Sequence, residues 1–431
     1  MSSGTRKAFI VVDLGFGDAG KGLLTDYLVR RHDARLVVRF NGGAQAGHNV
    51  VTADGRHHTF SQFGSGSFVP GVRTHLSRAV VVHPTALAVE AEVLAQSGIA
   101  DALERISIDG ECRVTTPFQQ AHNRLTELAR GADRHGSCGV GVGVTVSDSL
   151  HFPALTVRFG DLLEPSASLQ ERLRAQQEQK RAMWRAAKLT PEQAEEFAIL
   201  QDETVVDRWL ELASDVARRA ELLDDREALG ASTTTIFEGA QGVLLDEDFG
   251  FHPYTTYSRC TPHGALRLLA EAGFSGTIRS IGVLRSYAVR HGPGPFPTEA
   301  AELTATTTEP HNCRGPWQGP VRKGYFDVPL LRYALAASEH LDALCLTHLD
   351  ELPAKFCDRY ADTLPSLPRS IEEQVRVTQA LFAARPHYVA TGSAEAFCAR
   401  VSELVGVPVA YTASGPRASD VSELSPEPHG E

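Results

Sequence analysis

Hydrophobic positions near the N-terminus change from a strand-like run to helical spacing. Residues 8–12 read Ala-Phe-Ile-Val-Val and lead directly into glycines. A short apolar, β-branched run that ends in turn residues predicts a buried strand. In residues 23–28, Leu-Leu-Thr-Asp-Tyr-Leu, the apolar side chains recur with helical spacing. The predicted order is therefore strand, glycine loop, helix.

Further apolar runs predict additional strands. They occupy residues 36–40, 80–82, 233–237 and 343–347. The first runs straight into Asn41-Gly42-Gly43, which predicts a second backbone-rich loop at the same end of the sheet. The last two are predicted to be buried strands, and each is followed at once by polar residues. The pattern predicts an α/β fold with a large, mainly parallel central sheet and flanking helices.

The most helical part of the chain is a long segment at residues 166–225. It is rich in Ala, Leu, Arg, Glu and Gln, and Thr190-Pro191-Glu192-Gln193 has the pattern of a capping box that starts a new helix. We expect this segment to be an excursion on the flank of the sheet. No repeat or linker divides the chain, so residues 1–422 are predicted to form a single elaborated α/β domain. Residues 423–431, which hold Pro, Glu and Gly, are predicted to be a frayed tail.

The composition favours a water-soluble protein and argues against several other classes. Among 431 residues, 42% are hydrophobic and 22% are charged, which is typical of a water-soluble globular protein. No run of eighteen apolar residues occurs, and residues 1–7 lack the apolar stretch of a secretory signal, so we predict a cytoplasmic protein. The seven cysteines are scattered without a CxxC pair, which predicts reduced thiols rather than a disulfide framework or a zinc site. A net charge of -11 argues against a nucleic-acid or membrane partner but leaves a small anionic ligand possible.

The first glycine loop has the pattern of a phosphate-binding loop. Residues 15–21 satisfy GxxxxGK, in which backbone N–H groups surround phosphate and the lysine contacts its outer oxygens. Gly22 replaces the usual Ser or Thr that would hold magnesium. Asp18 inside the loop would repel a phosphate unless it binds the metal or removes a proton. The alternative is a tight strand-to-helix turn without a ligand.

The second loop, residues 41–49, places His48 after several small residues. Small residues let a ligand approach the backbone, so His48 is a candidate acid or charge stabiliser. A lone histidine is more often a structural hydrogen-bonding group, and its pairing with a phosphate loop favours the catalytic interpretation.

Five ordered motifs together resemble the adenylosuccinate synthetase family. They are Gly-Asp-Ala-Gly-Lys-Gly at 17–22, Asn-Gly-Gly-Ala-Gln-Ala-Gly-His at 41–48, Phe-Glu-Gly-Ala-Gln-Gly at 237–242 with Leu-Leu-Asp at 244–246, Gly-Pro-Phe-Pro-Thr-Glu at 294–299 and Thr-His-Leu-Asp at 347–350. The resemblance extends from about residue 8 to 417 and is far more specific than one glycine loop. It implies the P-loop-like GTP-binding fold of that family.

The resemblance implies a phosphoryl-transfer mechanism. The residue matching Asp18 deprotonates the purine N1, so that the 6-oxygen attacks the γ-phosphate of GTP, and it contacts Mg²⁺. The residue matching His48 stabilises the transferred phosphoryl group as an acid. Lys21, the Gly47 carbonyl and the metal share the phosphate charge. Phosphorylation turns a poor leaving group into one that the amino group of aspartate displaces, giving an N6-succinyl nucleotide.

The resemblance also implies residues that bind GTP as co-substrate. Asp350 matches an aspartate that accepts two N–H bonds from guanine, although a surface carboxylate is the alternative interpretation. His348 stands where the family has a lysine, which predicts weaker guanine selectivity. The implied GTP-binding set is Gly17, Gly20, Lys21, Gly22, His348, Asp350, Ser414, Gly415 and Pro416.

The substrate nucleotide and the amino acid have implied residues of their own. A loop at residues 137–143 is similar to the family's 5′-phosphate loop, although its glycines would also suit a simple turn. The implied nucleotide set is Gln45, Ser137, Cys138, Gly139, Arg158, Gln241 and Thr256. The family's amino-acid loop is absent in its usual form, and Arg314 or Arg322 could bind the carboxylate instead.

Several departures cluster around the substrate. Gln45 replaces an asparagine, Cys138 replaces a threonine, and the arginine that a partner subunit normally lends is missing from residues 149–153. Such changes are expected if the reaction is kept and the acceptor has shifted. The alternatives are a paralogue that uses another nucleotide, such as dGMP or a nucleoside-antibiotic precursor, or another amine, and a GTP-binding protein that has lost ligation. The family resemblance implies a homodimer and small-molecule partners only.

Overall fold

Strand β1 (Arg6–Asp13) is buried because it lies in the middle of a large sheet covered on both faces. Residues 8–12 are at most 2% exposed, as expected for an apolar strand of a mainly parallel sheet. The computed structural model describes residues 6–307, 317 and 319–424. Its ten-stranded sheet has the order β18 (Val421–Glu423), β17 (Val409–Ala413), β14 (Ala343–Thr347), β11 (Gly276–Arg285), β1, β10 (Thr234–Glu238), β2 (Leu36–Arg39), β5 (Arg73–Leu76), β7 (Ile106–Ile108) and β9 (Glu221–Leu222).

The direction of these strands positions the site. Every neighbouring pair in the sheet is parallel except β17 and β18. The carboxyl ends of the parallel strands therefore meet at one edge, which we call the carboxyl edge. Ligands of open α/β sheets bind outside this edge. The loops after β17, β14, β11, β1, β10 and β2 follow one another along it.

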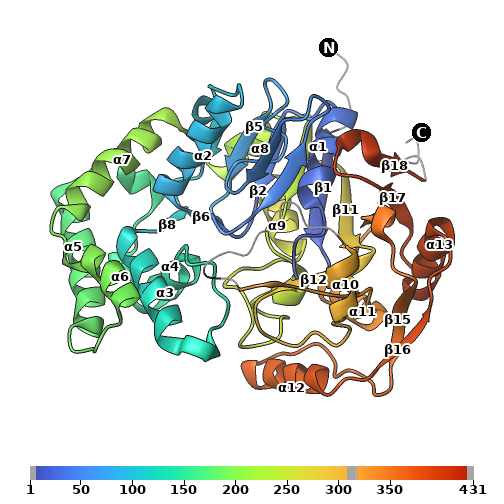
Figure 1. Ribbon diagram of the computed structural model, residues 1–431. Coiled ribbons are helices and arrows are strands. Elements are labelled where there is room, and N and C mark those ends of the chain that lie inside the picture. The colour runs from blue at the N-terminus through green and yellow to red at the C-terminus, as the bar shows by residue number, and fades with distance from the viewer. Residues whose placement is uncertain (1–5, 308–316, 318, 425–431) are drawn as a thin grey trace, which may run out of the picture.

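Helices cover the sheet, and smaller two-stranded sheets lie beside it (Figure 1). The helices are α1 (Lys21–Arg31), α2 (Pro84–Gln96), α3 (Pro117–Arg130), α4 (Val142–His151), α5 (Ala167–Trp184), α6 (Pro191–Gln201), α7 (Val205–Arg219), α8 (Asp225–Gly230), α9 (His263–Glu271), α10 (Ala301–Thr306), α11 (Val328–Ser338), α12 (Ile371–Phe382) and α13 (Ala394–Val405). The small sheets pair β3 (His48–Val51) with β4 (His57–Phe60), β6 (Val81–Val82) with β8 (Arg113–Val114), β12 (Tyr287–His291) with β13 (Val321–Tyr325), and β15 (Lys355–Tyr360) with β16 (Pro386–Ala390).

Most of the segment predicted to be a helical excursion consists of helices. Helices α5, α6 and α7 lie at one end of the molecule, far from α12 and α13 (Figure 1). The side chain of Thr190 accepts a hydrogen bond from the N–H of Gln193, and the side chain of Gln193 accepts one from the N–H of Thr190. These two bonds form the predicted capping box. The prediction is wrong at residues 221–222. These form β9, because their main chain pairs with β7 at the edge of the sheet.

The predicted tail begins too early. Glu423 pairs with Tyr411 as the last residue of β18, and Leu424 donates its N–H to the carbonyl of Ala410. Main-chain pairing with β17 therefore orders residues that composition alone assigned to a frayed end. Residues 425–431 lie outside the described part of the chain.

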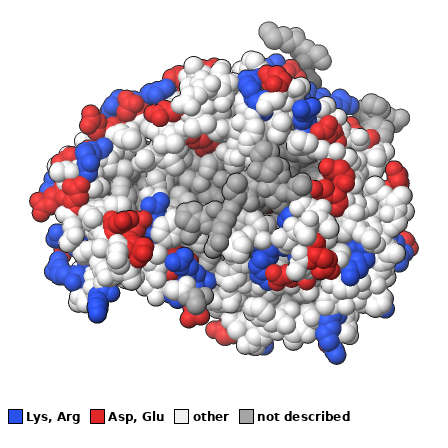
Figure 2. Space-filling model, viewed as in Figure 1, with Lys and Arg blue, Asp and Glu red and all other residues white. Residues whose placement is uncertain are grey.

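The surface and the cysteines have three simple features. Within the described residues, no helix combines the length and apolarity needed to cross a membrane. On the face shown in Figure 2, acidic and basic side chains are interspersed around the rim, and Lys and Arg dominate no described part of it. The cysteines that the structure describes carry free thiols: Cys112, Cys138, Cys260, Cys345, Cys357 and Cys398.

Candidate active site

A buried carboxylate, Asp13, anchors the loop between β1 and α1. Its Oδ1 accepts the N–H of Gly15 at 2.8 Å, and its Oδ2 accepts the N–H of Ala19 and the Nζ of Lys21, both at 2.9 Å. The Lys21 ammonium and the Asp13 carboxylate are almost completely buried. Sequence reasoning missed Asp13, although its place at the strand end directly before the glycine loop was a usable signal.

Close packing explains why the loop lacks its usual hydroxyl. A Cβ at Gly22 would lie 2.9 Å from the carbonyl of Asn49 and 3.0 Å from the Cβ of His48. Gly22 therefore leaves no room for a Ser or Thr side chain. The same contact brings the first turn of α1 against the start of β3, so the two glycine loops predicted from the sequence meet in the structure.

His48 forms a buried pair with Glu238, the last residue of β10. The Nδ1 of His48 lies 2.7 Å from Oε1 of Glu238, whose Oε2 accepts the N–H of Ser65 at 3.0 Å. Burial lowers the pKa of His48 to about 4; Glu238 opposes this shift, and the cations of Arg39 and Lys21 add to it. Burial alone would raise the pKa of Glu238, but His48 and Arg39 bring it down to about 2.

These charges fix the tautomer of His48. An ionised carboxylate only accepts hydrogen bonds, so the Nδ1 of the neutral imidazole carries the hydrogen that Glu238 accepts. The Nε2 of His48 is then free to take up a proton when an anion arrives. Glu238 belongs to a motif quoted from the sequence, but its role was not predicted because its partner lies 190 positions away.

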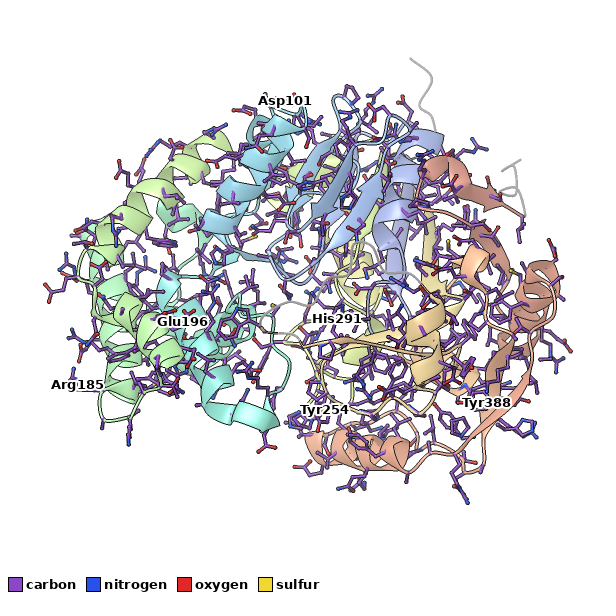
Figure 3. The ribbon with its side chains drawn as sticks, in the orientation of Figure 1. Asp101, Arg185, Glu196, Tyr254, His291 and Tyr388 are labelled. Carbon is purple, nitrogen blue, oxygen red and sulfur yellow. The ribbon has the colours of Figure 1, made fainter. Side chains whose placement is uncertain are left out.

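Asp18 lies on the exposed side of the loop. Its backbone is left-handed, with φ of 59°, and its side chain is 30% exposed. Oδ2 of Asp18 lies 3.0 Å from Nε2 of His291, and Nε of Arg285 donates to its main-chain oxygen at 2.5 Å. His291 lies in the middle of the molecule (Figure 3). Neither His291 nor Arg285 was singled out from the sequence.

Two glutamines predicted to bind the nucleotide lie beside the loop after β2. The Oε1 of Gln241 lies so close to Gly42 that a Cβ added to this glycine would be 3.1 Å from it. The Oε1 of Gln45 lies equally close to Gly43, at 3.1 Å from an added Cβ. Within the described residues, both polar atoms of the Gln241 amide and the oxygen of Gln45 are buried without a hydrogen-bond partner. Buried polar atoms left unpaired are costly, and a bound polar ligand would satisfy them.

The predicted 5′-phosphate loop is held from behind by α3. Ser137 Oγ donates to Asn123 at 2.8 Å and accepts the N–H of Gly139, while Arg124 donates to the carbonyl of Gly139 at 2.9 Å. Burial raises the pKa of the Cys138 thiol to about 11, so it remains neutral. A Cβ at Gly139 would lie 2.7 Å from the ring of Trp317, so this indole packs against the loop.

The residues predicted to bind guanine lie together at the far end of the carboxyl edge. Strands β14 and β17 are parallel neighbours, so their following loops, with His348 and Asp350 on one and residues 414–416 on the other, adjoin. Asp350 is exposed and has no bonding partner in the described chain. His348 adopts a left-handed φ of 56°, and burial together with Arg285 lowers its pKa well below the usual value.

Other predicted residues are placed less favourably. Arg158 is 46% exposed and pairs with Glu111 at 3.0 Å. Thr256 donates its N–H to the carbonyl of Leu245 at 2.8 Å, which fixes its loop. The Arg322 guanidinium already binds Glu299 and the carbonyls of Gly292 and Gly294, so it braces a loop rather than standing ready for a substrate carboxylate. Arg314 lies outside the described residues.

The donors present fit Mg²⁺. No group of three or more His, Cys, Asp or Glu that could hold a metal occurs in the part of the chain that the structure describes. Asp18 offers a partly exposed carboxylate, and Gly47, also exposed, offers its carbonyl. Mg²⁺ commonly keeps waters and substrate phosphates as ligands and takes only one or two protein oxygens, so this small donor set is suitable.

Comparison with known sequences decides the family. The sequence pattern of adenylosuccinate synthetase matches residues 10–422. The chain belongs to the adenylosuccinate synthetase family. The adenylosuccinate synthetase of Clostridium beijerinckii is 29% identical over 438 residues, covering 97% of this chain and 99% of the relative. That of a Marinomonas species is 31% identical over 449 residues, covering 95% and 96%.

Solved structures show the same fold. The fully ligated adenylosuccinate synthetase of Plasmodium falciparum superposes with a TM-score of 0.75 at 20% identity, covering 98% of this chain and 100% of the other. The succinoaminodeoxyadenylate synthetase of cyanophage S-2L superposes with a TM-score of 0.61 at 19% identity, covering 97% and 96%. The chain is thus a carbon–nitrogen ligase of the adenylosuccinate synthetase type or a paralogue of it. The family uses GTP as co-substrate and Mg²⁺ as cofactor.

Proposed function

We propose that this chain phosphorylates the 6-oxygen of IMP, or of an IMP-like purine nucleotide, and that aspartate displaces the phosphate to give an N6-succinyl nucleotide. One observation carries the proposal: at Gly22 the loop that holds Asp18 and Lys21 packs against the strand that begins with His48. A base, a phosphate-binding lysine and an imidazole thus belong to adjoining loops of the carboxyl edge.

Each of these groups has a separate task. Asp18 takes the N1 proton of the purine, which places negative charge on the 6-oxygen for attack on the γ-phosphate. Lys21 exchanges Asp13 for the phosphate oxygens as GTP binds. A protonated Nε2 of His48 donates to the transferred phosphoryl group, while Glu238 stabilises the imidazolium through Nδ1. Mg²⁺ held by Asp18 and Gly47 would neutralise phosphate charge.

The remaining roles follow the order of strands along the edge. Asp350, His348 and residues 414–416 bind guanine, and the loop N–H groups of Gly17, Gly20 and Gly22 bind the phosphates. Gln45 and Gln241 bind the substrate base, since their unpaired amides adjoin Gly42 and Gly43. Residues 137–139 bind the 5′-phosphate, with Arg158 and Thr256 as further contacts. Arg314 is the better candidate for the amino-acid carboxylate because Arg322 is already paired.

A paralogue with another acceptor is the second candidate. Gln45 and Cys138 differ from the usual family residues, and both lie in the proposed nucleotide pocket. The phage synthetase that shares this fold is described as bound to dGMP, with dATP as its energy donor. A deoxynucleotide of 2-amino-6-oxopurine and an adenine deoxynucleoside triphosphate are therefore alternative substrates for this chain. We also propose the homodimer and the cytoplasmic location expected from the sequence.

A product survey tests the proposal. The purified protein is incubated with GTP or dATP, Mg²⁺, each amino acid in turn, and a panel of ribo- and deoxynucleoside monophosphates, and products are identified by mass spectrometry. We expect an N6-succinyl nucleotide from IMP, aspartate and GTP. A succinyl product from dGMP alone would favour the paralogue. Nucleotide binding without product in any combination would favour a protein that has lost ligation.

A matched pair of variants tests the base. Asp18→Asn removes the proton acceptor, and Asp33→Asn makes the same change at an exposed aspartate with a similar left-handed φ of 48°. General bases contribute typically about 10²- to 10⁴-fold, so we expect a loss of that size in kcat for Asp18→Asn only. Equal activity of the two variants would remove Asp18 from the mechanism.

A further inference from the structure

A serine from another loop holds the carboxylate that binds His48. The main-chain N–H of Ser65 donates to Oε2 of Glu238 at 3.0 Å, and the hydroxyl of Ser65 donates to Oε1. Oε1 is also the atom that lies 2.7 Å from Nδ1 of His48. Ser65 and Glu238 are 0% exposed and His48 is 6% exposed, so all three side chains are buried. Each oxygen of the carboxylate is therefore bound by Ser65.

The loop that carries this serine is braced by the central sheet. It follows β4, and Nη1 of Arg39 donates to the carbonyls of Ser61 and Phe63 at 3.0 and 3.1 Å. The N–H of Gly64 donates to Oγ1 of Thr74 at 2.9 Å. Arg39 belongs to β2 and Thr74 to β5, which are neighbouring strands. The sheet therefore sets the position of the loop and of the serine in it.

The orientation of His48 depends on the orientation of this carboxylate. The last torsion of a glutamate side chain has only broad preferences, so hydrogen bonds are needed to define the plane of its carboxylate. An ionised carboxylate only accepts, and both polar groups of Ser65 donate to it. A hydrogen bond at one ring nitrogen of a histidine orients the ring and so determines where the other nitrogen lies. Ser65 thus defines the carboxylate plane, and the carboxylate directs the Nε2 of His48.

We propose that Ser65 is a positioning residue, which orients the Glu238 carboxylate and, through it, the Nε2 of His48 toward the phosphoryl group in transfer. The inference rests on the proposed function, since it assumes that His48 stabilises that group. It assigns a role in the reaction to a fully buried serine that acts through two other side chains. The contact matters most when charge develops on the phosphoryl group, so its loss should be seen in kcat and not in KM for GTP.

Two serines of the same loop provide a matched comparison. Ser65→Ala removes the hydroxyl that binds Glu238 and keeps the main-chain bond. Ser67→Ala removes a hydroxyl that is also buried, at 4% exposed, but that donates to the carbonyl of Gly64 at 2.7 Å. We expect similar decreases in thermal midpoint for the two variants. The kcat of Ser65→Ala should fall roughly tenfold to a hundredfold, which is the range for one hydrogen bond to a charged group, while that of Ser67→Ala stays within about twofold. KM for GTP should stay within about twofold in both.

A double-mutant cycle shows whether the serine acts through the carboxylate. Glu238→Gln replaces the carboxylate with an amide of the same shape. In that background Ser65→Ala should change kcat by no more than about twofold, because the charged group that the serine orients is already gone. A purely structural role of Ser65 would give the same loss of kcat in both backgrounds.

A His48→Ala variant separates this inference from the proposed function. Suppose that the unmodified protein forms the succinyl nucleotide and that His48→Ala is inactive. Equal kcat values for Ser65→Ala and Ser67→Ala, or equal losses from Ser65→Ala in both backgrounds, would then overturn the positioning role and leave the proposed function standing. If His48→Ala keeps full activity, the proposed acid fails, and the positioning role fails with it.

Discussion

At the scale of single residues, the phosphate loop is organised around a carboxylate that belongs to the chain itself. Asp13 accepts main-chain N–H groups of Gly15 and Ala19 and the ammonium of Lys21. The loop therefore carries an internal anion, and Lys21 has a partner within the chain. Because both charges are buried, the pair is costly to break from one side.

Asp13→Asn should destabilise the fold strongly. The amide can keep one acceptor, but its N–H₂ would then face the N–H of Ala19 and the ammonium of Lys21, both of which are donors. Removing one partner of a buried ion pair costs about 3–5 kcal/mol, so the free energy of unfolding should fall by roughly that amount in urea titrations. The exposed Asp33→Asn control should stay within about 0.5 kcal/mol. An unchanged midpoint for Asp13→Asn would contradict this account of the loop.

Sequence patterns single out the proposed site residues that belong to compact motifs. Asp18, Lys21 and His48 lie in glycine loops whose pattern carries a chemical meaning by itself. Glu238 and Ser65 could not be assigned, because each contacts a residue far away in the chain, and no local pattern records that contact. Pairing of this kind becomes visible only when the order of strands is known.

At the scale of elements, helix α11 begins with a buried acid. Asp327 caps the helix by accepting the N–H of Leu330 at 3.0 Å, and it accepts the hydroxyl of Tyr360 at 2.6 Å. Burial raises the pKa of Asp327 to about 7, well above its value in an unfolded chain. The native state therefore holds a proton at this carboxyl over a range of pH in which the unfolded state has lost it.

This difference predicts how stability changes with pH. The stabilisation from Asp327 is complete below about pH 4 and is lost as the pH rises to about 7, because the unfolded state gives up its proton first. Asp327→Asn keeps the cap without titrating. We compare the free energies of unfolding of the unmodified protein and of the variant. The unmodified protein minus the variant should decrease by on the order of 3 kcal/mol between pH 4 and pH 7. A difference that does not change with pH would contradict the assignment.

Asp350, which follows β14, is predicted to determine which nucleoside triphosphate is used. In the proposed function, the two carboxylate oxygens of Asp350 accept the N1–H and 2-amino groups of guanine. Asp350→Asn offers one acceptor and one donor, which matches the N1–H and 2-oxo groups of xanthine. Mispaired polar groups cost about 1–3 kcal/mol, so kcat/KM for GTP should fall roughly tenfold to a hundredfold while that for XTP rises. The exposed Asp362→Asn should change neither, and an unaltered preference for GTP in Asp350→Asn would exclude this contact.

Element boundaries show where sequence patterns end and tertiary contacts begin. The run at residues 343–347 coincides with β14, because a buried parallel strand is apolar along its whole length. Strand β9, at residues 221–222, was assigned to a helical segment. It is exposed and has no apolar pattern, and only its pairing with β7 makes it a strand. Glu423 joins β18 for the same reason.

At the scale of the whole molecule, the order of strands sets the order of the chemistry. The loops proposed to bind the guanine base, the phosphates and the substrate base follow one another along the carboxyl edge of the ten-stranded sheet, and the proposed phosphate loop also carries the proposed proton acceptor. A parallel sheet assembles such a row because every strand delivers its following loop to the same edge. The sequence motifs predict the loops, and the order of strands in the sheet determines which loops lie next to one another.

The central claim is that the purine 6-oxygen leaves as part of the phosphate. The most direct measurement uses IMP labelled with ¹⁸O at position 6, together with GTP, Mg²⁺ and aspartate, and determines by mass spectrometry where the label goes. The account predicts inorganic phosphate that carries one ¹⁸O atom and a succinyl nucleotide that carries none. Unlabelled phosphate released together with the same product would show that the 6-oxygen is never phosphorylated, and would contradict it.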